Sequence, residues 1–202
     1  MFTKSFIVFL TLASIGMGLY LYSMDVPINE VKYGASEILF FSIPFTMLLV
    51  NIQLFIFPKL FKFDVFTRYK KGIESIFLSL SIILALLYVG LILAATGREV
   101  NILLFIPVCA GIVLITTANT LPRFQLEIHQ TSSEFTQSTN QAWNIIIRPF
   151  SYPLFIGGIA MLLCVFLPDA LMLPGFLAIL LCTLLISIIY SYRAYQSYVN
   201  RQ

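Results

Sequence analysis

The chain has 202 residues, of which 59% are hydrophobic and only 10% are charged, and its formal net charge is +3. Soluble domains usually carry about 25% charged residues, so this composition excludes an ordinary soluble protein and indicates an integral membrane protein. A helix needs roughly 20 apolar residues to cross the hydrocarbon core of a bilayer. Six stretches without Asp, Glu, Lys or Arg meet or approach that length: 5–24, 38–58, 75–96, 100–122, 150–168 and 170–192.

These six stretches predict one all-α bundle of six transmembrane helices. Only helices and closed barrels satisfy their backbone hydrogen bonds in lipid, and the continuous hydrophobicity of the runs excludes the alternating pattern of a barrel. The first run follows Lys4, as in a signal peptide. However, it is longer than the usual core of about 7–15 residues and no Ala-x-Ala pattern follows, so we expect a retained span.

The distribution of basic residues predicts the orientation. Placing the N-terminus in the cytoplasm puts ten of the 12 Lys and Arg residues inside, five of them in the 58–71 connection. Lys and Arg favour the cytoplasmic side of short loops. Both termini and the polar segment between the fourth and fifth spans are therefore predicted to be cytoplasmic. The net charge follows from this topology and gives no reason to expect nucleic acid as a partner.

No ionisable residue lies in the interior of any predicted span, which counts against a proton-coupled transporter. The polar residues within the spans are neutral, and hydrogen bonding between helices is their expected role. The candidates are Asn51, Gln53, Thr116 and Thr117. Pro44 and Pro107 are predicted to kink the second and fourth spans. Gly90 and Ala94 form a small-xxx-small pair that permits close helix approach.

Catalytic and metal-binding patterns are missing from the sequence. The three cysteines are scattered through the spans and define neither a disulfide framework nor a metal site. His129 has Glu127 as its nearest possible co-ligand, at a spacing that does not suit a metal. The sequence therefore predicts no cofactor, no metal and no enzymatic activity.

The 116–150 segment is unusually polar for this chain. Ser138 and Gln141 fit a helix-capping box, and Trp143, Ile146 and Phe150 fall on one apolar helical face. The pattern predicts a short amphipathic helix on the inner membrane surface between spans four and five, anchored by Trp143. Pro149 is expected to begin span five, and 126–135 is expected to be an ordered loop over the bundle mouth.

Two parts of this segment resemble the signature of the bacterial SdpI-like immunity family. Thr117-Ala-Asn-Thr-Leu-Pro-Arg is similar to that family's Gly-Asn-x-Leu-Pro-Lys, and 135–148 is similar to its Trp-Thr-Leu-Ser-x-x-x-x-Trp-x-x-Thr-His-Arg. The positions in register are Asn119, Pro122, Thr136, Ser138, Trp143 and Arg148, and Arg123 stands at the Lys position. Residues 1–72 are similar to the DUF1648 segment often fused ahead of this family, and 73–202 to the SdpI-like part itself.

The resemblance implies a multi-pass protein of the bacterial plasma membrane that protects its producer from a secreted peptide toxin. It also implies a cytoplasmic repressor as a second partner, because some members hold one at the membrane. The seven residues in register are the corresponding candidates for toxin response. The family's Gly-Ile-Arg-Thr-Pro and Thr-His groups are absent, since 126–134 and Ile146-Ile147 replace them.

Two alternatives remain open at this stage. One is a small-solute or lipid-associated transporter that uses the spans containing Pro44 and Pro107 as its pathway, because a neutral substrate needs no charged residues. The other is a scaffold protein that has lost the family's ligand-binding groups. The sequence does not define an oligomeric state.

Overall fold

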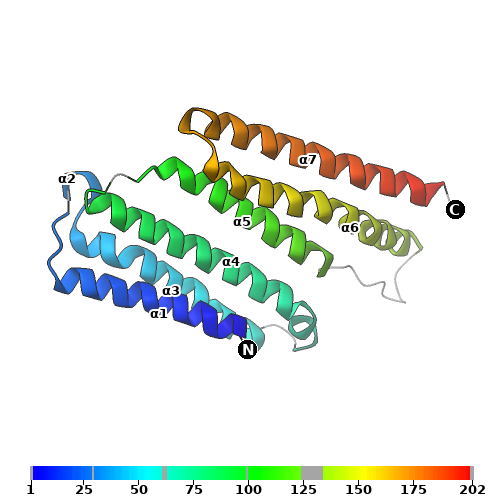
Figure 1. The fold of residues 1–202 in the computed structure, drawn as a ribbon. Helices are drawn as coiled ribbons and strands as arrows, with labels where there is room; N and C mark the ends of the chain where they lie inside the picture. Colours follow the sequence, from blue (N-terminus) through cyan, green and yellow to red (C-terminus); the bar gives the residue numbers. More distant parts are fainter. Residues whose placement is uncertain (1, 29, 61–62, 99, 124–133, 201–202) are drawn as a thin grey trace. The chain divides into compact units, whose positions relative to one another are not determined.

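The computed structural model describes residues 2–28, 30–60, 63–98, 100–123 and 134–200. These residues form helices joined by short connections and contain no strand (Figure 1). In chain order the elements are α1 (Phe2–Ser23), α2 (Glu30–Tyr33), α3 (Ser36–Leu60), α4 (Phe63–Ala95), η1 (Ile102–Leu104), α5 (Phe105–Thr120), η2 (Leu121–Arg123), α6 (Glu134–Leu163), η3 (Cys164–Phe166) and α7 (Asp169–Val199).

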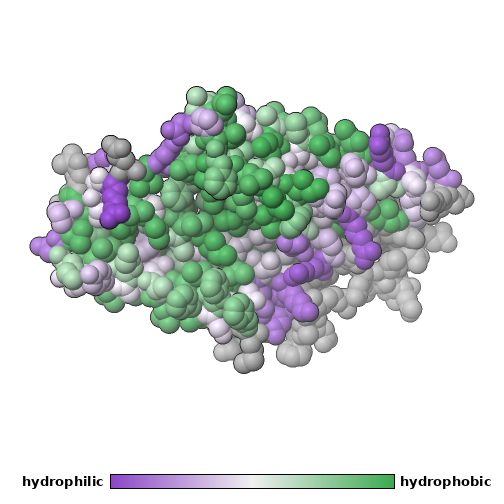
Figure 2. Space-filling view, in the orientation of Figure 1, coloured by the Kyte–Doolittle hydropathy of each residue, from purple (hydrophilic) through white to green (hydrophobic). Residues whose placement is uncertain are grey.

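The predicted six-span, all-α fold is confirmed. Among the described residues, six helices are long and apolar enough to cross a membrane: α1, α3, α4, α5, α6 and α7. Hydrophobic side chains cover much of the surface of these helices (Figure 2), and only 17% to 39% of each span is buried inside the protein. Exposed apolar surface of this extent suits contact with lipid.

The helices form two compact units, residues 1–105 and 106–202. The resemblance implies a boundary between a DUF1648-like and an SdpI-like part at residues 72 and 73. This boundary falls within α4 and does not coincide with the division between the two units. The two-part family relationship stays a prediction.

Unit 1 is built on three helices, α1, α3 and α4, each of which packs against the other two. Their buried positions recur at spacings of three and four residues, which is the pattern of helices that pack knobs into holes. In α1 these positions are Ile7, Thr11, Ser14, Gly18 and Leu21. In α3 they include Phe40, Pro44, Met47, Asn51 and Leu54.

One expectation for unit 1 is wrong in its boundary. The basic 58–71 stretch was expected to be a loop, but α4 begins at Phe63 and continues without a break into the membrane-spanning part. Hydropathy marks the apolar length of a helix and does not mark where the helix begins, because polar residues continue a helix into water at little cost.

The fourth span differs in a similar way. Pro107 was expected to kink it, but α5 begins at Phe105, so Pro107 lies in the first helical turn. The missing N–H of a proline has no helical acceptor there.

Gly90 and Ala94 were expected to permit close approach of another helix. The space beside Gly90 is filled by an aromatic ring and not by a helix backbone, since a Cβ atom on Gly90 would lie 2.8 Å from Cε2 of Phe105.

Unit 2 is held together by close glycine contacts. A Cβ atom on Gly157 of α6 would lie 2.7 Å from Cβ of Thr183 in α7. A Cβ atom on Gly111 of α5 would lie 2.8 Å from the Gly158 carbonyl oxygen of α6. Small residues at such crossings let transmembrane helices approach closely.

The polar segment differs from its prediction. A separate surface helix ending before Pro149 was expected, whereas α6 is one continuous helix that contains Pro149 and Pro153. Ser138 therefore lies inside the helix, four residues after its first residue Glu134, and does not occupy a capping position. The expected loop at 126–135 falls mostly outside the described residues. Attachment of the early part of α6 to the membrane surface stays a prediction.

The predicted orientation can be tested with single cysteines in a background without Cys109, Cys164 and Cys182. Asp25 and Asn200 are both exposed. We expect a membrane-impermeant maleimide to label the Asp25→Cys variant in intact cells and the Asn200→Cys variant only after permeabilisation, because the basic connections favour the cytoplasm. The opposite labelling pattern would reverse the assigned topology.

Candidate functional site

A buried polar layer joins the three helices of unit 1. The Asn51 side chain in α3 donates from Nδ2 to Oγ1 of Thr11 in α1 over 2.8 Å. Ser81 in α4 donates from Oγ to Oδ1 of Asn51 over 2.9 Å. All three side chains are buried, and amide and hydroxyl groups buried in an apolar bundle require such partners.

The hydroxyls of this layer also bond their own helices. Thr11 Oγ1 donates to the Ile7 carbonyl over 2.9 Å, and Ser81 Oγ donates to the Phe77 carbonyl over 2.8 Å. The single Ser81 hydrogen is therefore shared between Phe77 and Asn51. The layer is neutral and fully paired, which makes it a structural junction rather than a source of protons or nucleophiles.

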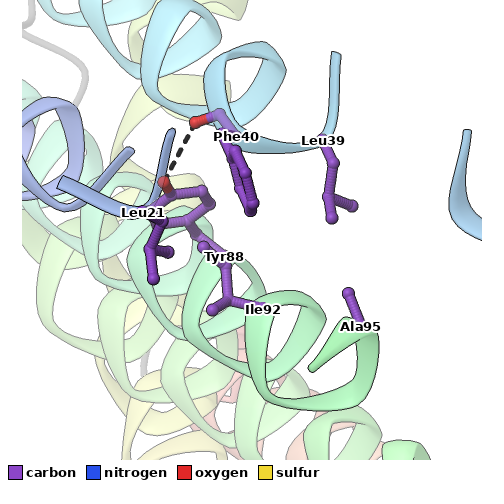
Figure 3. Close-up of a cluster of buried hydrophobic side chains, with 6 residues drawn as sticks. All are labelled: Leu21, Leu39, Phe40, Tyr88, Ile92 and Ala95. Atoms are coloured by element: carbon purple, nitrogen blue, oxygen red, sulfur yellow. Dashed lines mark hydrogen bonds between the residues drawn. The ribbon is translucent and has the colours of Figure 1, made fainter. Parts of the chain in front are cut away.

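A second junction lies toward the other end of the same helices. The Tyr88 hydroxyl of α4 donates to the Phe40 carbonyl of α3 over 2.9 Å (Figure 3). Gly18 of α1 covers this bond, because a Cβ atom there would lie 2.7 Å from the Phe40 oxygen and 3.0 Å from the Tyr88 oxygen. Leu21, Leu39, Ile92 and Ala95 belong to the same buried apolar cluster as Phe40 and Tyr88.

The two junctions are seven residues apart in α1 and α4, and in α3 the accepting Phe40 carbonyl lies eleven residues before Asn51. Thr11 and Gly18 belong to α1, Ser81 and Tyr88 to α4, and Asn51 in α3 lies seven residues from Pro44. Seven residues bring a helix back to nearly the same face, as in a coiled coil. The polar groups of the two junctions are thus stacked along one interior seam of unit 1.

An ion pair lies one further heptad along α1 and α4. Lys4 Nζ is 3.9 Å from Oε1 of Glu74 and 5.4 Å from the ring centroid of Phe55. Both charged side chains retain some exposure, and pairs of this kind stabilise a protein by about 1 kcal/mol or less. The pair marks the end of the seam and does not make a reactive site.

The intramembrane polar candidates have different outcomes. The prediction of hydrogen bonding between helices is confirmed for Asn51. Gln53 is exposed on α3, and Thr116 and Thr117 are half-buried on α5. The Thr116 carbonyl accepts the Thr120 hydroxyl within α5.

Sequence reasoning missed the partners of Asn51 and the whole Tyr88 junction. Thr11, Ser81 and Gly18 carry no distinctive signal singly, since Ser and Thr often bond their own helix. The available signal was the common seven-residue spacing of Thr11 and Gly18 in the first predicted span and of Ser81 and Tyr88 in the third. A further signal was Pro44 itself, because proline leaves a carbonyl one turn earlier without its helical donor.

The signature-like residues belong to unit 2. Asn119 is exposed at the end of α5, Pro122 is half-buried and Arg123 is exposed in η2, and Arg148 is exposed on α6. η2 packs against α6. Thr136, Ser138 and Trp143 lie within α6, but their side chains fall outside what the structure describes.

Within the described ranges, no three His, Cys, Asp or Glu residues are grouped in a way that could hold a metal ion. The absence of a cofactor and of enzymatic activity remains a prediction. No family model, no curated protein and no solved structure matches the chain.

Proposed function

We propose that this six-span membrane protein is an immunity protein that protects its producer cell against a secreted peptide toxin. The proposal rests on the resemblance of 117–123 and 135–148 to the SdpI-like signature. The contact between η2 and α6 supports it, because η2 contains Pro122 and Arg123 of the first segment and α6 contains the second.

This contact brings two parts of the chain together on either side of 124–133. α5 and α6 also meet at Gly111 and Gly158, so the two helices are held in one unit while their other ends carry Arg123 and the 134–148 part of α6. Asn119, Arg123 and Arg148 are each exposed, so their side chains are accessible to a protein or peptide partner.

In the proposed mechanism an amphipathic toxin meets the outer connections or lipid-facing helix surfaces and is prevented from assembling in the bilayer. Arg123, Arg148 and the helix between them present a cytoplasmic surface to a soluble partner such as a repressor. The bacterial plasma membrane is the corresponding location.

Survival of a sensitive bacterial strain tests the proposal. Cells that express the protein are challenged with the secreted peptides of the producer strain, beside cells that express Asn119→Ala or Trp143→Ala at equal membrane levels. We expect the protein to protect, and each variant to require about tenfold less toxin for killing, as for the loss of one good contact.

Two control variants test whether the loss of protection is specific to Asn119 and Trp143 or follows from removing any side chain of that type. Asn200→Ala removes an exposed amide outside the signature, and Phe9→Ala removes an exposed aromatic ring from α1. Both should protect like the wild type. If the Asn119 and Trp143 variants still protect, the outer connections rather than the signature-like residues are responsible for protection. Failure to protect against any fraction would overturn the proposal and direct attention to solute uptake.

A further inference from the structure

We propose that α3 contains a hinge at Pro44 that is closed by the hydrogen bond from the Tyr88 hydroxyl to the Phe40 carbonyl. When this bond opens, residues 36–43 move as a segment while the remainder of α3 stays packed. The inference concerns the interior of unit 1 and does not depend on the proposed immunity function.

Pro44 removes a backbone hydrogen-bond donor from α3. In an α-helix the carbonyl of residue 40 accepts the N–H of residue 44. Residue 44 is a proline, which has no N–H and whose ring crowds the preceding turn. The Phe40 carbonyl, in the second turn of the Ser36–Ile56 span, therefore lacks its helical bond, and α3 is weakest at this turn.

Tyr88 of α4 supplies the Phe40 carbonyl with a replacement donor. Tyr88 is 1% exposed, and its hydroxyl oxygen lies 2.9 Å from the Phe40 oxygen. Gly18 closes the junction from the side of α1, where no Cβ atom could be accommodated. A backbone carbonyl in hydrocarbon requires a partner, so the Tyr88 bond holds the two parts of α3 in their observed alignment.

The parts of α3 before and after Pro44 are held to the other helices by different kinds of contact. On one side, Asn51 is bonded to both Thr11 and Ser81, which fixes that part of α3 to α1 and α4. On the other side, Leu39 and Phe40 pack against the apolar cluster of Leu21 and Ile92. Apolar contacts without direction permit small displacements that a bonded polar layer resists.

The movable segment is continuous with the connection between α1 and α3. Val26, Ile28 and Tyr33 of that connection pack against the same apolar cluster as Phe40. Displacement of the connection therefore acts on the segment that the Tyr88 bond restrains. The hinge thus links the surface connection to the interior seam of unit 1.

Hydrogen–deuterium exchange in lipid nanodiscs tests the hinge. Tyr88→Phe removes the hydroxyl and retains the ring, and Tyr20→Phe is the matched control, because Tyr20 is 56% exposed on α1. We expect exchange of the amides of residues 39–43 and 45–47 to accelerate about tenfold in Tyr88→Phe, as for an unpaired buried carbonyl. The amides of residues 50–56 should exchange as in the wild type, and Tyr20→Phe should change neither region.

A second substitution makes the test specific for the carbonyl. Pro44→Ala restores an N–H at position 44, so the Phe40 carbonyl regains a helical donor and no longer needs Tyr88. Exchange in the Pro44→Ala, Tyr88→Phe double variant should match that of Pro44→Ala alone. If Tyr88→Phe accelerated exchange equally in the wild-type and Pro44→Ala backgrounds, the hinge would be overturned. Exchange that stays unchanged in Tyr88→Phe, or that accelerates uniformly along α1, α3 and α4, would also overturn it.

Discussion

Replacing Gly157 by leucine is expected to destabilise the protein by at least about 3 kcal/mol, the upper part of the range for overpacked cores. Even the first side-chain atom would lie 2.7 Å from Cβ of Thr183. The Cβ atom of Thr183 is bonded directly to the α7 backbone, so no side-chain rotation relieves the contact. The α6 and α7 backbones must separate, and the buried Thr183, Ser187 and Ser191 positions of α7 lose their close packing.

Gly16→Leu is the matched control for this substitution. Gly16 also lies in a transmembrane helix, but nothing is found within 4 Å of the position of its Cβ atom. Unfolding by sodium dodecyl sulphate in mixed micelles, followed by circular dichroism, should show a large loss of stability for Gly157→Leu. Gly16→Leu should remain within about 1 kcal/mol of the wild type. Equal losses in both variants would mean that leucine at a helical glycine, rather than the α6–α7 contact, sets the effect.

Asn51→Asp is expected to cost about 3 kcal/mol, comparable with the penalty for a charged side chain at the centre of a transmembrane helix. The substitution retains the shape of Asn51 and replaces the donor to Thr11 with an acceptor oxygen. Asn51 is only 5% exposed, so water cannot solvate the new carboxylate. The same unfolding titration measures the loss.

Gln53→Glu provides the comparison on the same helix. Gln53 is exposed and two residues closer to the end of α3, and a longer charged side chain there can extend toward the headgroups. We expect a loss below about 1 kcal/mol at this position. If Gln53→Glu were as destabilising as Asn51→Asp, the buried layer of Thr11, Asn51 and Ser81 would not be the source of the effect.

The number and class of the helices were predictable because lipid imposes a length of apolar chain on every span. The ends were less predictable. α4 begins at Phe63 rather than near Ser75, and α7 continues to Val199 beyond its apolar run. The early part of α6 is likewise continuous with its span. In each case helical hydrogen bonding continues after hydrophobicity ends, so a boundary read from hydropathy falls inside a helix.

The interior junctions were predictable only in part. Asn51 was identifiable because an amide within a span needs a partner. Its partners were not, because a Thr or Ser hydroxyl is satisfied equally well by its own helix, as Thr11 and Ser81 also show. Tyr88 lies well inside the predicted 75–96 span, and its role follows only from its position opposite the Phe40 carbonyl, which lacks its helical donor because residue 44 is proline.

The fixed separation of the two junctions along each helix restricts how the first three spans can assemble. Transmembrane helices associate after insertion, and apolar surfaces alone permit them to slide by a turn. Sliding α3 by one turn would separate Asn51 from Thr11 and Ser81 and would also remove Tyr88 from the Phe40 carbonyl. Only one alignment satisfies both junctions, so they select the correct register during biogenesis, as a buried asparagine does in a coiled coil.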